Sequence, residues 1–302
     1  MQKFQLVLVP DWLGSAHKTG VEYGPSVLEK AIGRSDIRKH IAKPTYRISS
    51  PRPNPSHSRG RYASVKFLPE LKKMFQETQK KVMKVIQEGN IPLVLMGEDS
   101  SMMGVVSAVS KKMGNAYGIV WFDAHGDINT PKTSLTGRLY GMALAHLLGL
   151  GDTRLTALNG VKPSLLARNV VMLGQRSLDP GEKQIIRKEH IHVYTSSAIN
   201  RRPASEIAGE IRRKFRKNHA KGLFIHIDLD CLEPVQSPGV SLHEPGGIAP
   251  KKLVELVGLL AREESLLLGV CVASYTPKAD RADKTKTIAL QLLTAIAESN
   301  MQ

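Results

Sequence analysis

Seven short apolar runs, spaced along the whole chain, limit most strongly what this sequence can fold into. They cover residues 4–9, 92–96, 118–122, 169–173, 191–194, 222–227 and 266–273. Most of these runs are continuous rather than alternating, a pattern typical of parallel strands that are covered on both faces. The sequence therefore predicts a largely parallel sheet with both faces buried.

Amphipathic helical patterns lie between several of these runs. The predicted stripes are Leu71, Phe75, Val82 and Ile86 before a stop at Gly89; Ile207, Ile211 and Phe215 after Pro203; and Leu253, Val257 and Leu260 after Pro250. Strands that alternate with helices predict βαβ units and an α/β fold. Because no linker divides the chain, we expect one domain over residues 1–302, with residues 51–61 as a loop that caps or flanks the functional site.

Composition excludes several protein classes. With 41% hydrophobic and 23% charged residues, the 302-residue chain is neither disordered nor collagenous nor a coiled coil. The net charge of +16 is compatible with an anionic partner or with a solubilising surface. The densest basic run, residues 212–217, falls on the solvent side of a predicted helix, and aromatic residues are only 5%, which argues against a nucleic-acid partner.

The chain shows no signal for export or membrane insertion. Its first ten residues are too short and polar a segment for a signal peptide, and no apolar run is long enough to span a bilayer. Cys231 and Cys271 lie in apolar stretches where buried free thiols are expected, which fits a reducing compartment. We therefore expect a cytoplasmic protein without a membrane partner.

Acidic residues stand at the ends of two of the apolar runs. Asp123, His125 and Asp127 follow one run, and Asp228 and Asp230 follow another. Residues two apart in an extended chain share a face, and parallel α/β sheets bind ligands at the carboxyl ends of their strands. If the two strands are neighbours, four carboxylates and one imidazole converge at one edge of the sheet.

Such a cluster is costly to hold in a partly desolvated cleft unless cations neutralise it. Oxygen-rich ligands with one imidazole favour Mn²⁺, followed by Mg²⁺ or Fe²⁺, over a thiolate-type zinc site. Two such ions can share a water molecule and convert it to hydroxide near neutral pH. The alternative is that aspartates at strand ends only cap helices and form turns.

Five segments match the motifs of one enzyme superfamily. They are residues 20–25 (GVEYGP), 97–101 (GEDSS), 123–131 (DAHGDINTP), 174–182 (GQRSLDPGE) and 228–234 (DLDCLEP). Together they resemble the ureohydrolases, which comprise arginases, agmatinases and formiminoglutamases, and most closely the arginases. The resemblance covers nearly the whole chain and implies a three-layer α/β/α fold with a mostly parallel central sheet, a homo-oligomer (trimer or hexamer) and a small-molecule substrate.

The resemblance also implies a dimanganese centre that activates water against a guanidinium or amidine carbon. Transferred to the matching positions, Asp123 and Asp228 would bridge the two ions. His125 and Asp230 would complete the ligands of one ion, and Asp127 would help to complete those of the other and take part in catalysis.

Three further positions match residues that bind the substrate in the family. Asn129 and Thr136 match positions that hold the amino-acid end of arginine in arginases, and Asp179 matches an acid near the α-amino group. In the same loop as Asp179, Ser177 replaces one acid of the family pattern.

Three other departures affect the chemistry itself. Ser100 replaces a histidine that ligates the more exposed metal, and a neutral hydroxyl is a poor substitute for imidazole. Tyr140 replaces the histidine that serves as a proton shuttle, although the reference pKa of tyrosine is near 10. Ser274 replaces a glutamate that orients the guanidinium, which removes a charge-assisted pair to a cationic substrate.

Four residues are candidates for compensation. His226 shares strand parity with the aspartates that follow it and either supplies the missing imidazole or packs in the sheet, bonded to a neighbour. Glu98 is a second possible donor, and His243 and Glu244 either reach the mouth of the site or remain on a surface loop.

The residues thus support two principal functional hypotheses. The first is a Mn²⁺-dependent hydrolase of a guanidino or amidino compound that is inefficient on arginine. The second is a catalytically degenerate relative that retains one metal ion and has a structural or regulatory role.

Overall fold

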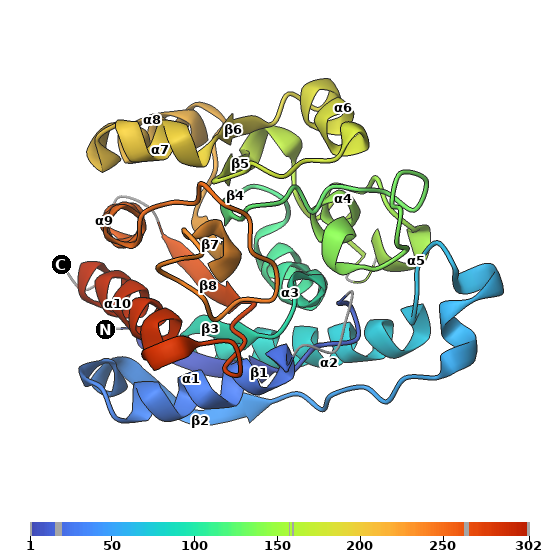
Figure 1. Ribbon diagram of the computed structural model, residues 1–302, viewed down its shortest axis with the longest axis horizontal. Helices are drawn as coiled ribbons and strands as arrows, with labels where there is room; N and C mark the ends of the chain where they lie inside the picture. The colour runs from blue at the N-terminus through green and yellow to red at the C-terminus, as the bar shows by residue number, and fades with distance from the viewer. Residues whose placement is uncertain (1, 16–19, 157, 159, 263–265, 301–302) are drawn as a thin grey trace.

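An eight-stranded sheet forms the centre of the computed structural model, which describes residues 2–15, 20–156, 158, 160–262 and 266–300. Within these residues all strand pairs are parallel, in the order β2-β1-β3-β8-β7-β4-β5-β6 (Figure 1). The strands are β1 (Phe4–Val9), β2 (Ile41–Arg47), β3 (Ile91–Met96), β4 (Gly118–Phe122), β5 (Val170–Leu173), β6 (His192–Tyr194), β7 (Leu223–Asp228) and β8 (Leu267–Ala273).

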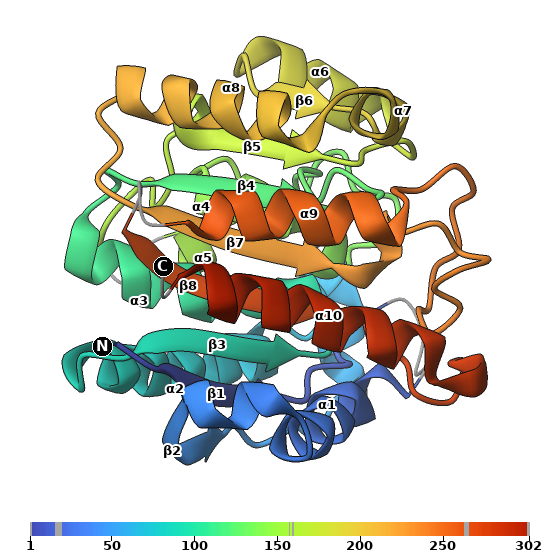
Figure 2. The same cartoon turned by 90° about the vertical axis from the view of Figure 1, so that its left-hand side faces the viewer.

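Helices cover both faces of this sheet, which gives three layers. The helices α1 (Gly24–Gly33), α8 (Ala204–Lys217), α9 (Pro250–Ala261) and α10 (Lys284–Ser299) pack on one face (Figure 2). The helices α2 (Leu68–Gln87), α3 (Met102–Met113) and α4 (Ala143–Leu147) pack on the other. The shorter helices are α5 (Thr153–Thr156), α6 (Pro180–Lys188) and α7 (Ser196–Arg201). Alternate residues of β1 enter the two cores, so the strand is apolar on both sides.

The predicted α/β fold is confirmed, and each of the seven apolar runs forms a strand. The prediction missed β2, a strand at the edge of the sheet whose sequence includes the exposed residues Lys43 and Pro44. Only one side of an edge strand needs partners, so it tolerates proline and polar residues and lacks the apolar signal. The three predicted helical stripes lie in α2, α8 and α9.

The basic run 212–217 lies on α8, where Phe215 is buried and Arg213, Arg216 and Lys217 are exposed, as the prediction of a solvated face requires. None of the described helices combines the length and the apolar character needed to cross a bilayer.

Gly97, directly after β3, allows two chain segments to approach closely. Its N–H donates to the Val9 carbonyl and its carbonyl accepts from the N–H of Ser274, both at 2.9 Å. A Cβ atom at this position would lie 1.9 Å from the backbone oxygen of Asp11.

We therefore expect Gly97→Ala to lower the free energy of unfolding by about 3 kcal/mol, since backbone must move to admit the methyl group. Urea unfolding of the metal-free protein measures this loss. Gly33→Ala is the matched control, because no atom lies within 4 Å of the added Cβ at that helix end. Equal stability of the two variants would contradict the close approach at Gly97.

Candidate metal centre

The residues that follow β4 form one half of an acidic cluster. Asp123 is fixed by two hydrogen bonds, which its Oδ1 accepts from the His125 N–H at 2.7 Å and its Oδ2 from Trp121 Nε1 at 3.1 Å. Asp127 is buried and lies in the left-handed backbone region, with φ 50°. The strand ends at Phe122, so a turn rather than continued strand parity gathers these side chains.

β7 supplies the other half of the cluster. Asp228 is its last residue, and Asp230 lies in the 3₁₀ turn that follows. β4 and β7 are neighbours with Phe122 opposite Ile227, so Asp123 and Asp228 leave the sheet side by side. The predicted convergence at one sheet edge is therefore present.

Polar contacts connect the two halves. His125 Nδ1 lies 3.0 Å from Asp230 Oδ2 and 3.4 Å from Asp123 Oδ1, and the N–H of Ala124 donates to Asp230 Oδ1 at 3.1 Å. One ligand atom each from Asp123, His125 and Asp230 lies within 4.8 Å of the others. This spacing is compact enough for the three side chains to hold one metal ion.

The loop after β7 contributes at the mouth of the site. Glu244 Oε1 lies 3.6 Å from His125 Nε2, so Glu244 reaches the cluster. His243 does not, because its exposed ring lies 3.1 Å from the Pro238 carbonyl oxygen.

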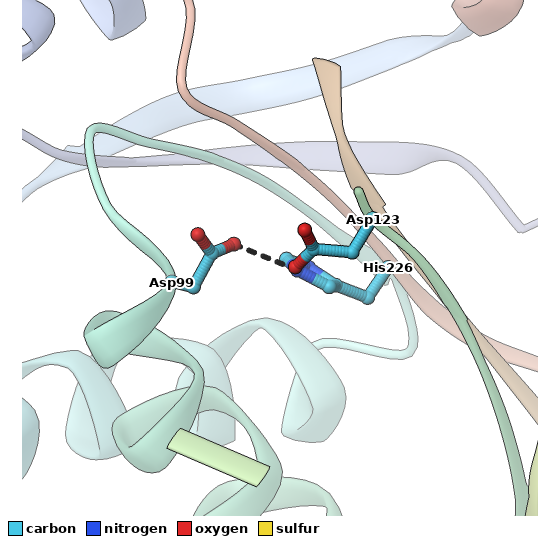
Figure 3. Close-up of side chains that lie close together, drawn as sticks. All are labelled: Asp99, Asp123 and His226. Carbon is cyan, nitrogen blue, oxygen red and sulfur yellow. Dashed lines mark ion pairs between the residues drawn. The ribbon is translucent and has the colours of Figure 1, made fainter. Parts of the chain in front are cut away.

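A second group of closely spaced ligand atoms comes from Asp99, Asp123 and His226 (Figure 3). Asp99 lies in the 3₁₀ turn after β3, and His226 lies within β7. His226 Nε2 is 2.8 Å from Asp99 Oδ1, and all three side chains are buried. The side chain of His226 therefore points toward the cluster rather than into an apolar part of the core.

Burial and mutual repulsion raise the pKa values of Asp127, Asp228 and Asp230. Burial and the charge of Asp230 raise the pKa of Asp228 to about 7. Burial, followed by the charge of Asp123, raises the pKa of Asp127 well above its usual range. Burial lowers the pKa of His125, but Asp230 and Asp123 outweigh that effect and raise it overall. The cluster therefore cannot carry its full negative charge without a compensating cation.

A cavity of about 260 Å³ opens beside the cluster. Its wall contains His125 and Asp127 together with the predicted substrate and loop residues Asn129, Thr136, Tyr140, Ser177 and Asp179. Asn129 Nδ2 donates to Asp179 Oδ2 at 2.8 Å, so the cavity wall carries a paired carboxylate. Residues 51–61 are not among the residues that line the cavity.

Two substituted serines do not line this cavity, and each bonds to a buried carboxylate. The buried Ser100 donates its hydroxyl hydrogen to Asp11 Oδ2, on the loop after β1. The buried Ser274 donates to Asp228 Oδ2. Ser274 thus contacts an acid of the cluster, whereas the prediction placed it against substrate.

The comparisons with known proteins agree with this architecture. Residues 2–297 match the model of the arginase family. The chain belongs to the arginase family. It is 31% identical over 297 residues to the arginase of Bacillus caldovelox, with 97% of each chain covered, and 31% identical over 291 residues to that of Bacillus subtilis, with 95% of each covered. The solved B. caldovelox arginase covers all of both chains with a TM-score of 0.91 and 29% identity.

Formimidoylglutamase of B. subtilis shares the fold, with a TM-score of 0.77 and 18% identity, over 99% of this chain and 87% of its own. The predicted superfamily and three-layer fold are therefore confirmed, and the chain is an arginase-family hydrolase.

Sequence reasoning gave no role to two residues that shape the site of this arginase-family protein. Glu182 closes a capping box with Asp179 at the start of α6 and accepts a hydrogen bond from the Ile128 N–H at 3.2 Å. It thereby ties α6 to the loop that carries Asp127. The Asp-Pro-Gly-Glu pattern is a capping-box signal that could have predicted this contact.

Arg176 is the second such residue. It donates to the carbonyl oxygens of Asp230 at 2.8 Å, Leu232 at 3.3 Å and Glu244 at 2.7 Å. Further bonds reach the carbonyls of Gly174 and Cys231. One guanidinium thus holds the turn that presents Asp230, and no sequence signal indicates such bonds to backbone.

Proposed function

We propose that this arginase-family protein is a Mn²⁺-dependent hydrolase that cleaves a C–N bond of a guanidino or amidino compound, with arginine as a poor substrate. The observation that carries the proposal is the meeting of Asp123 and Asp228 at the ends of adjacent strands, beside a polar cavity. Buried acids in this number are stable together when cations balance their charge.

The residues present fit a divalent cation. The donors are carboxylates with imidazole, a combination that suits Mn²⁺. Asp127 Oδ2 is buried and has no hydrogen-bond partner within the described part of the chain, which a ligand role would supply. Asp123, Asp228, Asp127, His125 and Asp230 would hold the ions. When bound, such ions lower the pKa of a water molecule so that hydroxide is available near neutral pH.

The cavity residues define what the substrate must offer. Asp179, oriented by Asn129, can accept hydrogen bonds from a cationic or amide group. Burial, followed by the charge of Glu98, raises the pKa of Tyr140, so its phenol stays protonated at neutral pH. We therefore assign Tyr140 as a hydrogen-bond donor to substrate rather than as a proton shuttle.

A direct test measures release of urea or ammonia by the Mn²⁺-supplemented protein with four compounds: arginine, agmatine, guanidinobutyrate and formiminoglutamate. We expect turnover of at least one compound at a rate well above that with arginine. No turnover with any of the four would contradict the proposal.

Ser274→Glu is expected to improve kcat/KM for arginine by about tenfold to a hundredfold, because it adds a carboxylate that can pair with the guanidinium. Steady-state kinetics measures the change. Ser274→Gln is the control, since it has the same size without the charge. An equal gain in both variants would show that shape, not charge, limits arginine hydrolysis.

One observation favours a second candidate, a degenerate protein with a single ion and a structural or regulatory role. The hydroxyl of Ser100 is directed to Asp11, so this position offers no imidazole to a metal. Metal counting distinguishes the candidates, because two Mn²⁺ ions per chain support catalysis and one supports the degenerate form.

From the family resemblance we also propose that the protein is a cytoplasmic homo-oligomer, either a trimer or a hexamer. Sedimentation-velocity measurements would determine the mass of the oligomer in solution.

A further inference from the structure

The buried histidine of β7, His226, lacks the hydrogen bonds that a histidine packed in a protein core normally makes. His226 is fully buried, and neither ring nitrogen makes a hydrogen bond within the described part of the chain. Asp99 Oδ1, 2.8 Å from His226 Nε2, also lacks a hydrogen bond of acceptable geometry. A buried polar group without a partner costs about 1–3 kcal/mol, so this arrangement requires a stabilising partner.

Strand parity and strand pairing direct the imidazole toward the acids. His226 lies two residues before Asp228 on the same face of β7, and it pairs in register with Trp121 of β4. The rings of Trp121 and His226 are 4.1 Å apart, while Trp121 Nε1 bonds to Asp123. One indole therefore fixes the imidazole and a carboxylate relative to each other, as supporting residues do in metal sites.

The donor atoms at this position suit a cation. Asp99 and Asp123 offer carboxylate oxygens, and the imidazole of His226 offers a ring nitrogen. Ligand atoms of Asp99, Asp123 and His226 lie within 4.8 Å of one another. A neutral imidazole with two carboxylates suits a divalent transition metal.

We propose that His226 and Asp99, together with Asp123, form a relocated metal site that holds one divalent transition-metal ion in this protein. The imidazole comes from strand β7 instead of the loop position of Ser100, whose hydroxyl bonds to Asp11. This inference rests on the metal requirement of the proposed function and names the ligands of one ion.

The test titrates Mn²⁺ into the metal-free protein by isothermal calorimetry. Wild type is expected to bind two ions, and His226→Asn to weaken one of them by about a hundredfold without changing the other. His125→Asn is expected to weaken the other ion. His146→Asn is the matched control, because His146 is also buried but bonds to the Met142 carbonyl, and its titration should equal that of wild type.

A transfer of the imidazole provides an independent check. The double variant Ser100→His with His226→Ser is expected to recover the affinity that His226→Asn loses to within about tenfold, because the ring returns to the loop position. If the His226→Asn protein fails to fold, anomalous scattering from crystals of the Mn²⁺-loaded wild type provides the test instead. An anomalous peak bounded by Asp99, Asp123 and His226 supports the site, and peaks only beside His125 and Asp230 overturn it.

The outcomes separate this inference from the proposed function. Unchanged Mn²⁺ binding in His226→Asn overturns the relocated site and leaves the hydrolase proposal intact. A His226-dependent ion in a protein that turns over none of the four substrates upholds the site and contradicts the hydrolase. Absence of Mn²⁺ binding in wild type contradicts both.

Discussion

Replacement of Asp228 by asparagine is expected to stabilise the metal-free protein by about 2–4 kcal/mol at pH 8 and to abolish tight Mn²⁺ binding. In the folded chain, burial and Asp230 raise the pKa of this carboxyl to about 7, from 3.8. Asparagine mimics the neutral acid and keeps an oxygen that can accept the Asp230 N–H, which donates at 2.6 Å. The substitution also removes the negative charge of the carboxylate, which a bound cation requires.

The sign of the pH dependence follows from this shift. Because the folded state binds the proton more tightly than the unfolded state, the carboxyl supports folding fully below pH 4. That contribution is lost as the pH rises toward about 7. The advantage of Asp228→Asn should therefore be absent below pH 4, grow between pH 4 and 7, and remain constant above.

Chemical denaturation of the EDTA-treated proteins from pH 4 to 8 measures this profile, and calorimetric titration measures metal binding. Asp36→Asn is the control, because Asp36 is exposed at the surface. If the Asp228→Asn protein were less stable than wild type throughout this pH range, the prediction would be contradicted. Repulsion among the carboxylates would then not be the main contribution of Asp228 to the free energy of unfolding.

Replacement of Arg176 by methionine is expected to lower the free energy of unfolding by about 3–5 kcal/mol, since the carbonyls that the guanidinium joins would lose a charged donor. The bonds at 2.8 Å to Asp230 and 2.7 Å to Glu244 cross between segments far apart in the chain. Without them the turn of Asp230 loosens, and Mn²⁺ affinity should fall by about tenfold or more.

Urea unfolding and metal titration check the two effects separately. Arg176→Lys keeps the charge but lacks the planar fork, so it should restore only part of the stability. Arg187→Met removes an exposed arginine and should change stability by about 0.5 kcal/mol or less. If the Arg176→Met protein were as stable as the Arg187→Met protein, the carbonyl bonds would contribute nothing.

The sequence predicts which segments form strands, but it does not predict the order of the strands in the sheet. The apolar runs identify the six inner strands because these are largely buried on both faces. The edge strand β6 keeps a short apolar run, whereas the edge strand β2 is mostly polar and escapes. Asp123 and Asp228 are predictable as a pair since each stands at the end of a buried strand. That convergence required the two strands to be neighbours, which the sequence alone does not determine.

Contacts that depend on tertiary structure were harder to foresee. Asp99 meets His226 although β8 separates their strands in the sheet, so neither motif nor spacing predicts the contact. The bonds from Arg176 go to backbone oxygens, which every residue offers, and they leave no trace in residue type.

The Trp121 indole lies tilted against the His226 ring, with ring centroids 4.1 Å apart, so Trp121 can report optically on this position. The chain contains two tryptophans, so with Trp12 changed to phenylalanine all indole emission would arise beside the acids. A paramagnetic ion arriving there would quench the light, and stopped-flow fluorimetry could then time its entry and departure without any attached dye.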